Sequence, residues 1–265
     1  HVEVGLQAHA LEMVAAAVAA LPNLATVIFT AGRKSGAPGA EDLTWAMNVH
    51  VPAIVAEAFA GSRIVAFSTG NVYPFLPLAS MGATEDTAPE STSGEYGNSC
   101  LGRERIFQYF SGRHDTPGRI LRLNYAIDMR YGVLHDIASK VFAGAPVDVT
   151  MGHVNVIWQG DANAQTLRVL RHCTMPTTPL NISGPETLSV RALAEAFGKH
   201  FGRAPVITGT EAPDALLTNT AEASRLFGDP LVPLAALIDW TADWVARGQA
   251  DLGKPTHFEV RDGRY

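Results

Sequence analysis

Residues 63–73 read RIVAFSTGNVY, and this stretch decides the fold class. The apolar run at its start predicts a buried strand, since short apolar runs bounded by turn residues are typical of parallel sheets. Ser68 and Thr69 follow the run directly, so we expect two hydroxyl groups at the carboxyl end of that strand. Residues 96–104 read YGNSCLGRE and place Tyr96 at the start of the next predicted helix. The stretch therefore predicts a strand, a polar edge and a helix in the order of a βαβ unit.

The rest of the chain continues this alternation of strand and helix patterns, which predicts a parallel sheet flanked by helices. The elements expected up to residue 125 are a strand at 25–30 ending in Ala31-Gly32, a helix at 41–60, the strand at 63–68, a long loop at 74–94, a helix at 96–110 and a strand at 118–123. The elements expected after it are helices at 131–143, 162–172, 190–201 and 234–247 and strands at 154–158 and 180–183.

Two of these predicted helices have an apolar face with helical spacing, and we expect that face to point inward. The inward residues expected of the helix at 41–60 are Trp45, Val49, Ile54, Val55 and Phe59. The inward residues expected of the helix at 131–143 are Val133, Ile137, Val141 and Phe142.

The bulk properties of the 265 residues exclude several classes of protein. A formal net charge of −6 and the absence of a Lys/Arg run argue against nucleic acid as a partner. Two cysteines, Cys100 and Cys173, fit a reducing compartment, so we expect a cytoplasmic protein. The uncharged run at 13–32 is interrupted by Pro22-Asn23 and is better explained by an amphipathic helix and a buried strand than by a membrane span.

The order of the motifs resembles the extended short-chain dehydrogenase/reductases, and more narrowly the NAD-dependent epimerase/dehydratase family. The resemblance rests on the strand ending in Ala-Gly, a helix containing Asn48, the STGNVY strand end, and a tyrosine segment with Glu104 eight residues after Tyr96. Residues 156–161 (VIWQGD) and 180–190, which begin LNISG and end LSV, are similar to later segments of that family. Members of the family commonly act on nucleotide-activated sugars.

The resemblance implies an α/β fold with a Rossmann-like doubly wound parallel sheet and a smaller C-terminal substrate lobe. We assign residues 1–125 and 154–182 to the dinucleotide-binding domain, and residues 126–153 and 183–265 to the substrate-binding lobe.

The resemblance also assigns roles to individual residues. Thr69 takes the position of the catalytic Ser/Thr, Tyr96 that of the catalytic tyrosine, and Cys100 that of the lysine one helical turn later. The positions implied to contact NAD or NADP, or to support that contact, are Ala31, Gly32, Asn48, Ser68, Leu123, Asn124 and Tyr125.

The chemistry of these positions can be stated from the residue types. Hydride transfer at a hydroxyl-bearing carbon needs a group that accepts or donates the hydroxyl proton. A tyrosine has an ordinary pKa near 10, so it acts as a base at neutral pH when a nearby cation or hydrogen-bond donor stabilises its phenolate. The Thr69 hydroxyl would donate to the substrate oxygen as negative charge develops there.

Cys100 is the first departure from the family pattern, because a thiol supplies no positive charge. Arg103 is an alternative cation, but it lies two helical turns from Tyr96, and helical side chains tilt toward the N-terminus, so we favour this alternative less. A nucleophilic Cys100 is a further alternative to a small buried helix residue, and burial is the favoured interpretation.

The second departure is the phosphate-binding Gly-x-x-Gly-x-x-Gly turn, since no such string precedes Ala31. The N-terminal βα units of a doubly wound sheet are therefore missing from this chain, and we expect a natural protein longer by about 60–75 N-terminal residues, two βα units of roughly 30 each. If the protein began at residue 1, NAD binding would not be expected. The segment at 32–36 (GRKSG) is interpreted as a mobile loop.

Two functions are weighed. The first is an NAD(P)-dependent epimerase or dehydrogenase acting on a nucleotide sugar or similar hydroxylated substrate; dehydration is disfavoured because no carboxylate directly follows Thr69. The second is a catalytically impaired relative, with Cys100 in place of the lysine, that binds nucleotide or serves a scaffolding or regulatory role.

The assembly expected from the resemblance is a homodimer formed through the tyrosine helix and the helix before it. The apolar residues offered for that contact are Leu101, Phe107, Tyr109 and Phe110, and the alternative is that the same residues face the sheet. We assign no metal, because the histidines show no ligand spacing.

Overall fold

The computed structural model describes residues 13–261 except 19, 23 and 35–38. The described residues form two compact units. The first contains the described residues up to Val72 together with Ser93–Arg122 and Thr166–Leu180. The second contains Tyr73–Thr92, Leu123–Gln165 and the described residues from Asn181 onward.

This division differs from the predicted one in its boundaries. Residues 73–92 and 154–165, which we assigned to the dinucleotide-binding domain, group with the second unit. The predicted α/β class with a parallel sheet is confirmed.

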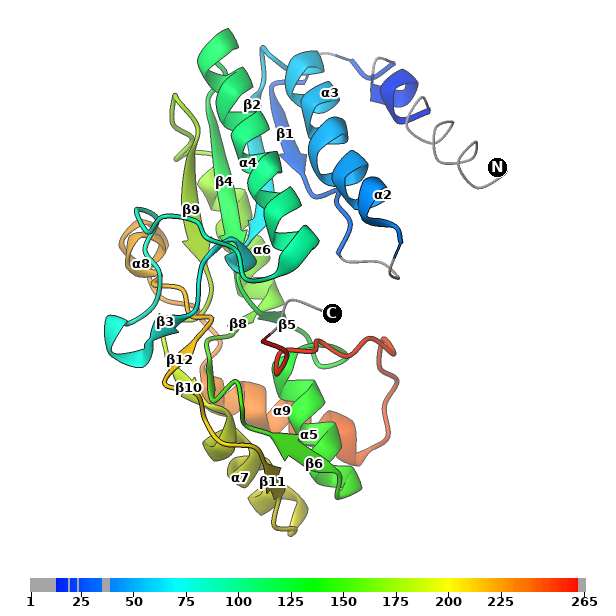
Figure 1. Cartoon of the computed structure of the whole chain (residues 1–265), viewed down its shortest axis with the longest axis vertical. Coiled ribbons are helices and arrows are strands. Elements are labelled where there is room, and N and C mark those ends of the chain that lie inside the picture. The colour runs from blue at the N-terminus through cyan, green and yellow to red at the C-terminus, as the bar shows by residue number, and fades with distance from the viewer. Residues whose placement is uncertain (1–12, 19, 23, 35–38, 262–265) are drawn as a thin grey trace. The chain divides into compact units, whose positions relative to one another are not determined.

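The first unit is built on a four-stranded parallel sheet in the order β1-β2-β4-β9 (Figure 1). In β1 and β2, Thr26 pairs with Arg63 and Phe29 with Ala66, so the two strands run in register and in parallel. The elements of this unit are β1 (Thr26–Phe29), α2 (Glu41–Trp45), the π-helix η1 (Ala46–His50), α3 (Val51–Ala58), β2 (Arg63–Thr69), the 3-10 turn η2 (Gly70–Val72), α4 (Gly94–His114), β4 (Gly118–Leu123) and β9 (Thr178–Ile182), the last two of which end in the second unit.

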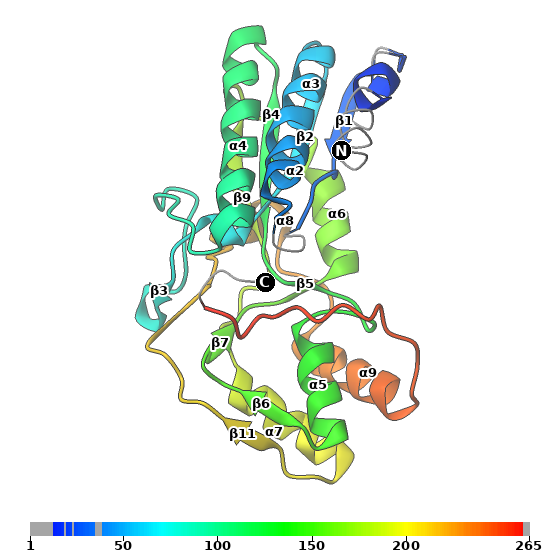
Figure 2. The same ribbon diagram turned by 45° about the vertical axis from the view of Figure 1, so that its right-hand side comes forward.

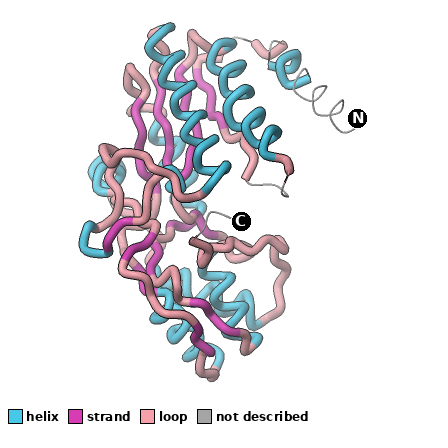
Figure 3. The backbone as a smooth tube through the Cα atoms, in the orientation of Figure 1, coloured by secondary structure: helices cyan, strands magenta, loops and turns pink. Residues whose placement is uncertain are grey.

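Helices α3 and α4 lie along one face of this sheet, as the tube in Figure 3 also shows. The core of this unit contains buried apolar side chains from both the strands and the helices: Phe29, Val55, Phe59, Ile64, Phe107 and Ile120. Gly102 allows α4 to approach η1 closely, because a Cβ there would lie 2.9 Å from Val49 Cγ2. Phe107 is thus a core residue, which agrees with the alternative that it faces the sheet and removes it from the expected dimer surface.

The predicted helix at 41–60 is present, but a π turn at Ala46–His50 interrupts its α-helical geometry. A π turn contains an extra residue, so a 3.6-residue periodicity cannot hold across it. Val55 and Phe59 are buried as predicted, whereas the prediction for Trp45 is wrong: its side chain is 40% exposed and its indole N–H donates to Glu95. Asn48, in the middle of the π turn, is fully buried.

The second unit groups three helices, α5, α7 and α9, around a core of its own (Figure 2). Short strands pair at its periphery, for example β6 with β11 in parallel and β7 with β10 antiparallel. Its elements are β3 (Leu76–Pro77), the 3-10 turn η3 (Leu78–Ser80), β5 (Ala126–Ile127), α5 (Val133–Ala143), β6 (Pro146–Asp148), β7 (His153–Val154), β8 (Ile157–Trp158), α6 (Gln159–Val169, which ends in the first unit), β10 (Leu188–Ser189), α7 (Val190–Phe201), β11 (Val206–Thr208), β12 (Asp214–Ala215), α8 (Ala221–Phe227) and α9 (Leu234–Ala246).

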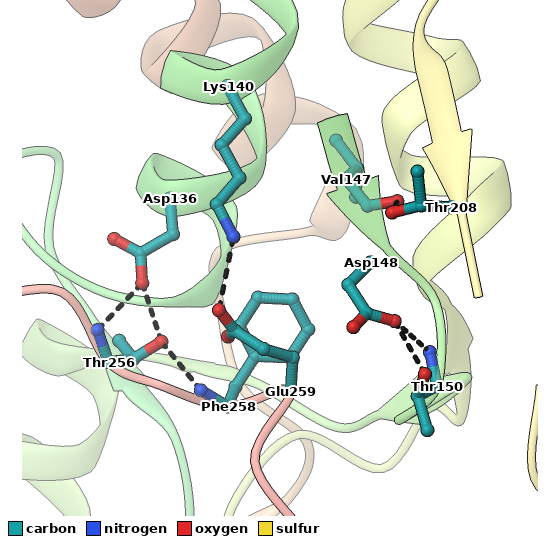
Figure 4. Close-up of polar contacts among 9 residues, drawn as sticks. All are labelled: Asp136, Lys140, Val147, Asp148, Thr150, Thr208, Thr256, Phe258 and Glu259. Atoms are coloured by element: carbon teal, nitrogen blue, oxygen red, sulfur yellow. Dashed lines mark hydrogen bonds and ion pairs between the residues drawn. The ribbon is translucent and has the colours of Figure 1, made fainter. Parts of the chain in front are cut away.

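Hydrogen bonds and an ion pair connect the segment after α9 to α5, as Figure 4 shows. Thr256 donates to the Asp136 carboxylate from its main-chain nitrogen at 2.7 Å and from its hydroxyl at 2.6 Å. Lys140 pairs with Glu259 at 3.2 Å, and Phe258 between these contacts is buried in the unit's core. This segment is therefore an integral part of the second unit.

Three other expectations in this unit are corrected. The strand predicted at 154–158 is divided into β7 and β8, because the Asn155 side chain between them donates to the carbonyls of Gly184 and Thr218. The helix predicted at 162–172 begins at Gln159 and ends at Val169. Phe142, predicted to point inward, is 45% exposed at the last turn of α5, although its ring still contacts Phe201.

No helix in the described part of the chain is long and apolar enough to cross a membrane.

Replacing Phe197 with alanine tests the core of the second unit. Phe197 is fully buried and its ring lies 6.3 Å from that of Phe201, so Phe197→Ala should lower the free energy of unfolding by about 3–5 kcal/mol. Phe142→Ala is the matched control, because Phe142 contacts the same Phe201 ring from an exposed position, and it should cost less than half as much. Urea unfolding followed by circular dichroism measures both, and equal losses would contradict this assignment of the core.

Candidate active site

The site begins at the carboxyl end of β2, where the predicted hydroxyl residues lie. Thr69 is the last residue of the strand and is buried, and its hydroxyl accepts a hydrogen bond from the Asn71 main chain at 3.2 Å. Tyr96 lies in the first turn of α4, and its side chain is close enough to Thr69 for the Thr69 hydroxyl to lower the pKa of the phenol. The structure therefore brings together the two residues to which the sequence assigns proton transfer.

The surroundings of the Tyr96 phenol hold its pKa well above the ordinary value of a tyrosine. Burial is the largest cause, and the neighbouring Cys100 acts in the same direction. The Thr69 hydroxyl and the positive charge of Arg103 oppose this rise. Tyr96 is consequently protonated at neutral pH in this structure, in the form that donates a proton.

Cys100 is buried one helical turn after Tyr96, as its favoured interpretation predicted. Burial raises the pKa of its thiol to about 11, against a smaller lowering by Arg103. At neutral pH Cys100 is therefore a neutral thiol, which neither supplies a cation nor acts as a nucleophile.

Asn48 connects the parts of the site from the π turn. Its side-chain oxygen accepts a hydrogen bond from the Arg33 main chain at 2.8 Å, and its amide group donates to the Arg33 carbonyl and to Ser99 Oγ, each at 2.9 Å. These bonds join the end of β1, the helix before β2 and helix α4. Since π turns inside helices are frequent at functional sites, the placement of Asn48 agrees with the supporting role expected of it.

The side chain of Arg103 extends further from its own turn of α4 than we predicted from the sequence. Its guanidinium is buried and donates to the Phe67 carbonyl at 2.9 Å and to the Asn48 side-chain oxygen. A Cβ on Gly32 would lie 3.0 Å from Arg103 Cζ and closer still to Nη2. The guanidinium thus extends along α4 to the ends of β1 and β2, at the place for which the resemblance implies a cofactor contact.

Glu104 and Arg122 form a buried ion pair beneath the site. The guanidinium of Arg122 in β4 donates to both carboxylate oxygens, from Nη2 at 2.7 Å and from Nε at 3.0 and 3.3 Å. Ser68 donates to the same carboxylate at 2.6 Å. The Ser68 hydroxyl therefore has a structural partner, while a cofactor contact by Ser68 stays a prediction.

The remaining predicted residues are distributed between the two units. Ala31 and Gly32 are exposed at the end of β1. Leu123, Asn124 and Tyr125 belong to the second unit, where Asn124 is buried and donates to Asn155 at 3.1 Å. Tyr125 has a φ of 44°, an uncommon conformation for a residue other than glycine, which marks this strand end as constrained.

Among the described residues, no group of three or more His, Cys, Asp and Glu side chains could hold a metal ion.

Comparison with solved structures shows that the chain shares its fold with nucleotide-sugar enzymes. A UDP-glucuronic acid 4-epimerase from Bacillus cereus, solved with NAD, matches with a TM-score of 0.73 and 18% identity over 85% of this chain and 75% of its own. A UDP-glucose 4-epimerase from Thermotoga maritima, solved with UDP-glucose, matches with a TM-score of 0.72 and 16% identity over 90% and 82%. RMD from Pseudomonas aeruginosa, solved with NADPH, matches with a TM-score of 0.73 and 17% identity over 88% and 86%.

Identities this low establish a common fold, and they leave the activity of this chain to be argued from its own residues. No protein-family model and no curated protein matches the sequence.

Removing one partner of the buried Glu104–Arg122 pair should be strongly destabilising. Glu104→Leu leaves a buried guanidinium without its carboxylate and should lower the free energy of unfolding by about 3–5 kcal/mol. The double variant Glu104→Leu/Arg122→Met should recover most of that loss, because both charges are then absent.

Urea unfolding measures this cycle. Glu222→Gln is the control, since the Glu222–Arg225 pair is exposed and should contribute at most about 1 kcal/mol. A double variant no more stable than Glu104→Leu would contradict the electrostatic explanation.

Both thiols should react slowly at pH 8. Burial raises the pKa of Cys100 and of Cys173 to about 11 from an ordinary 9.0, so the thiolate fraction should be about 100-fold lower than that of an ordinary thiol. The rate of labelling by iodoacetamide should then rise roughly tenfold per pH unit toward pH 11. Mass spectrometry of the Cys173→Ser and Cys100→Ser variants separates the two sites, and rapid labelling of Cys100 at pH 8 in the folded protein would contradict its neutral state.

Proposed function

We propose that this chain is an NAD(P)-dependent oxidoreductase or epimerase that acts on a hydroxyl-bearing carbon of a nucleotide sugar or similar substrate. The observation that carries the proposal is that Thr69 and Tyr96 lie next to each other at the carboxyl end of a parallel strand. Ligands of open α/β sheets bind outside the carboxyl ends of the strands, so the pair lies where a substrate is expected. The fold shared with epimerases solved with NAD and with UDP-glucose supports the same class.

The described residues near this strand end fit an anionic dinucleotide. Arg33, whose Nε has no hydrogen-bond partner within the described part of the chain, adds a positive charge near this strand end. Arg103 adds a second positive charge beside Gly32. The residues of the first unit proposed to hold NAD or NADP are Ala31, Gly32, Arg33 and Asn48. Leu123, Asn124 and Tyr125, to which the resemblance also gives a cofactor contact, belong to the second unit, and their role stays a prediction.

The chemistry of the protein residues follows from their protonation states. When bound, the nicotinamide cofactor accepts or donates the hydride. The Tyr96 phenol donates a proton to the substrate oxygen in reduction and accepts it in oxidation. Thr69, which lies next to Tyr96, polarises the same oxygen. The elevated pKa of Tyr96 favours the donor direction and requires a positive charge nearby for the reverse.

A second candidate function, a catalytically impaired relative that binds nucleotide or a partner protein, is favoured by one observation. Cys100 is a buried neutral thiol at the place where the family resemblance implies a lysine. Cys100→Lys separates the two candidates. An impaired enzyme should gain turnover, whereas a binding protein should show no turnover in either form.

The expected homodimer and cytoplasmic location also stay proposals. With Phe107 in the core, the exposed Tyr109 and the partly buried Leu101 and Phe110 are the residues left on α4 for a subunit contact.

Fluorescence titration of the protein at its natural length with NADH and NADPH tests the proposal first, because the phosphate-binding turn is not among the residues of this sequence. Saturable binding of either nucleotide supports the oxidoreductase class, and absence of binding to both overturns it. Turnover is then assayed with UDP-glucose and UDP-glucuronic acid as probes, with sugar epimers followed by NMR.

Replacing the phenol tests the role of Tyr96 in that assay. Tyr96→Phe should lower kcat by about 10²–10⁴-fold and leave nucleotide affinity unchanged, because the proton-transfer group is lost while the site is otherwise intact. Tyr109→Phe is the matched control, since Tyr109 lies on the same helix, is exposed, and accepts a hydrogen bond from Arg113. Equal activities of the two variants would remove Tyr96 from the mechanism.

A further inference from the structure

A cavity of about 430 Å³ lies in the second unit, between helix α5 and the segment that follows α9. This volume is within the range of small-molecule sites in proteins. Figure 4 shows how the segment is bound to α5 through Asp136 and Lys140, which both line the cavity. We call this space the α5 cavity, and its lining is polar and charged rather than apolar.

A serine and a histidine lie one turn apart on the face of α5 that lines this cavity. His135 Nε2 is 3.3 Å from Ser139 Oγ. A serine inside a helix commonly donates to the main-chain carbonyl of the preceding turn, whereas this hydroxyl is bonded to the imidazole ring in that turn. A hydroxyl and a base at this distance are the parts of an activated nucleophile, and the distance is often slightly long when no substrate is bound.

The imidazole of His135 is oriented from its other side. Its Nδ1 lies 2.8 Å from the Met129 carbonyl. A carbonyl oxygen only accepts, so Nδ1 carries the ring proton, and Nε2 of the neutral ring is the acceptor that faces Ser139. His135 is 8% exposed, and the buried ring is therefore held in this position. The Met129 carbonyl is thus the third group that a nucleophile and its base require.

Two charged side chains of the opposite wall complete the group. The Asp251 carboxylate lies 3.7 Å from His135 Nε2, and its negative charge favours the imidazolium that forms when the ring takes up a proton. Because Asp251 faces the same ring nitrogen as Ser139, the group is a dyad oriented by a carbonyl and differs from a Ser-His-Asp triad. Lys254 also lines the cavity, and its ammonium is of the kind that stabilises a developing oxyanion.

We propose that Ser139 and His135 form a second catalytic site, in the α5 cavity, which hydrolyses esters of small carboxylic acids. Ser139 Oγ forms a bond to the ester carbonyl carbon while its proton passes to His135 Nε2. The bond to the alcohol oxygen then breaks, and the alcohol leaves with that proton. Water attacks the acyl group on Ser139, its proton passes through His135 to Ser139 Oγ, and the acid is released. Water is the only co-reactant.

Diisopropyl fluorophosphate tests this pair on the full chain, because it reacts with a serine that a neighbouring base activates. Mass spectrometry should find one phosphoryl group on Ser139, formed with release of fluoride. His135→Gln should slow this labelling by about 10²-fold, since the general base is lost. Ser224→Ala is the matched control, because Ser224 is a partly buried helical serine of the same unit, and it should leave the labelling unchanged.

Turnover is measured with p-nitrophenyl acetate. The parent protein should hydrolyse it with saturation, and Ser139→Ala should lose this activity, while Ser224→Ala should keep it. Alanine favours the helical conformation, so Ser139→Ala should retain α5. Hydrolysis that persists in folded Ser139→Ala would overturn the inference.

A thiol in place of the hydroxyl tests the base by a second route. A neighbouring imidazole promotes the thiolate, so iodoacetamide at neutral pH should alkylate the new thiol of Ser139→Cys about tenfold faster than that of Ser224→Cys. Cys173 is the internal standard in both variants, since burial raises its pKa to about 11 and keeps its alkylation slow.

Absence of a phosphoryl group on Ser139 would overturn the inference. Equal labelling rates in the parent protein and in His135→Gln, with equal near-ultraviolet circular dichroism, would also overturn it. If His135→Gln does not fold, the two cysteine variants decide, and equal alkylation rates of their new thiols would overturn it. These measurements need neither NADH nor NADPH, so their outcome is independent of the function proposed for Tyr96 and Thr69.

Discussion

The first unit depends on the hydrogen bonds that the buried carboxylate of Glu104 accepts from two strands. The carboxylate accepts hydrogen bonds from Arg122 in the central strand β4 and from Ser68 at the end of β2, so one side chain holds α4 against two strands. Since Tyr96 is carried by α4 and Thr69 directly follows Ser68, the same contact sets the distance between the two proposed catalytic side chains. Replacing the carboxylate would therefore disturb the site as well as the stability of the fold.

The electrostatics of the site follow from burial and from one residue at the π turn. Burial raises the pKa of both Tyr96 and Cys100, which leaves a site of neutral groups unless a cation is brought in. The π turn makes that possible, because it turns two oxygens of Asn48 toward a single guanidinium. The guanidinium of Arg103 is thus held by Asn48, and the absence of a side chain at Gly32 leaves room for it.

Several features of this protein could be predicted from local patterns. The strand at 63–68, its hydroxyl edge and the helix beginning near Tyr96 were evident, because apolar runs and periodicity report directly on local structure. The position of Arg103 could not be predicted in this way. We expected its side chain to remain near its own turn of α4, and its actual reach depends on the empty space at Gly32 and on Asn48, which come from other segments. Arg122 was missed for a similar reason, although an arginine within an apolar strand pattern, eighteen residues after Glu104, was a signal for a buried ion pair.

The sequence by itself determined the α/β class and the order of the elements, because both follow from short-range patterns. That Thr69 and Tyr96 act together was implied by the family resemblance. Only the tertiary structure decided where the guanidinium of Arg103 lies. Its surroundings are formed by residues 29, 32, 48 and 67, which meet only when the sheet and its helices have packed.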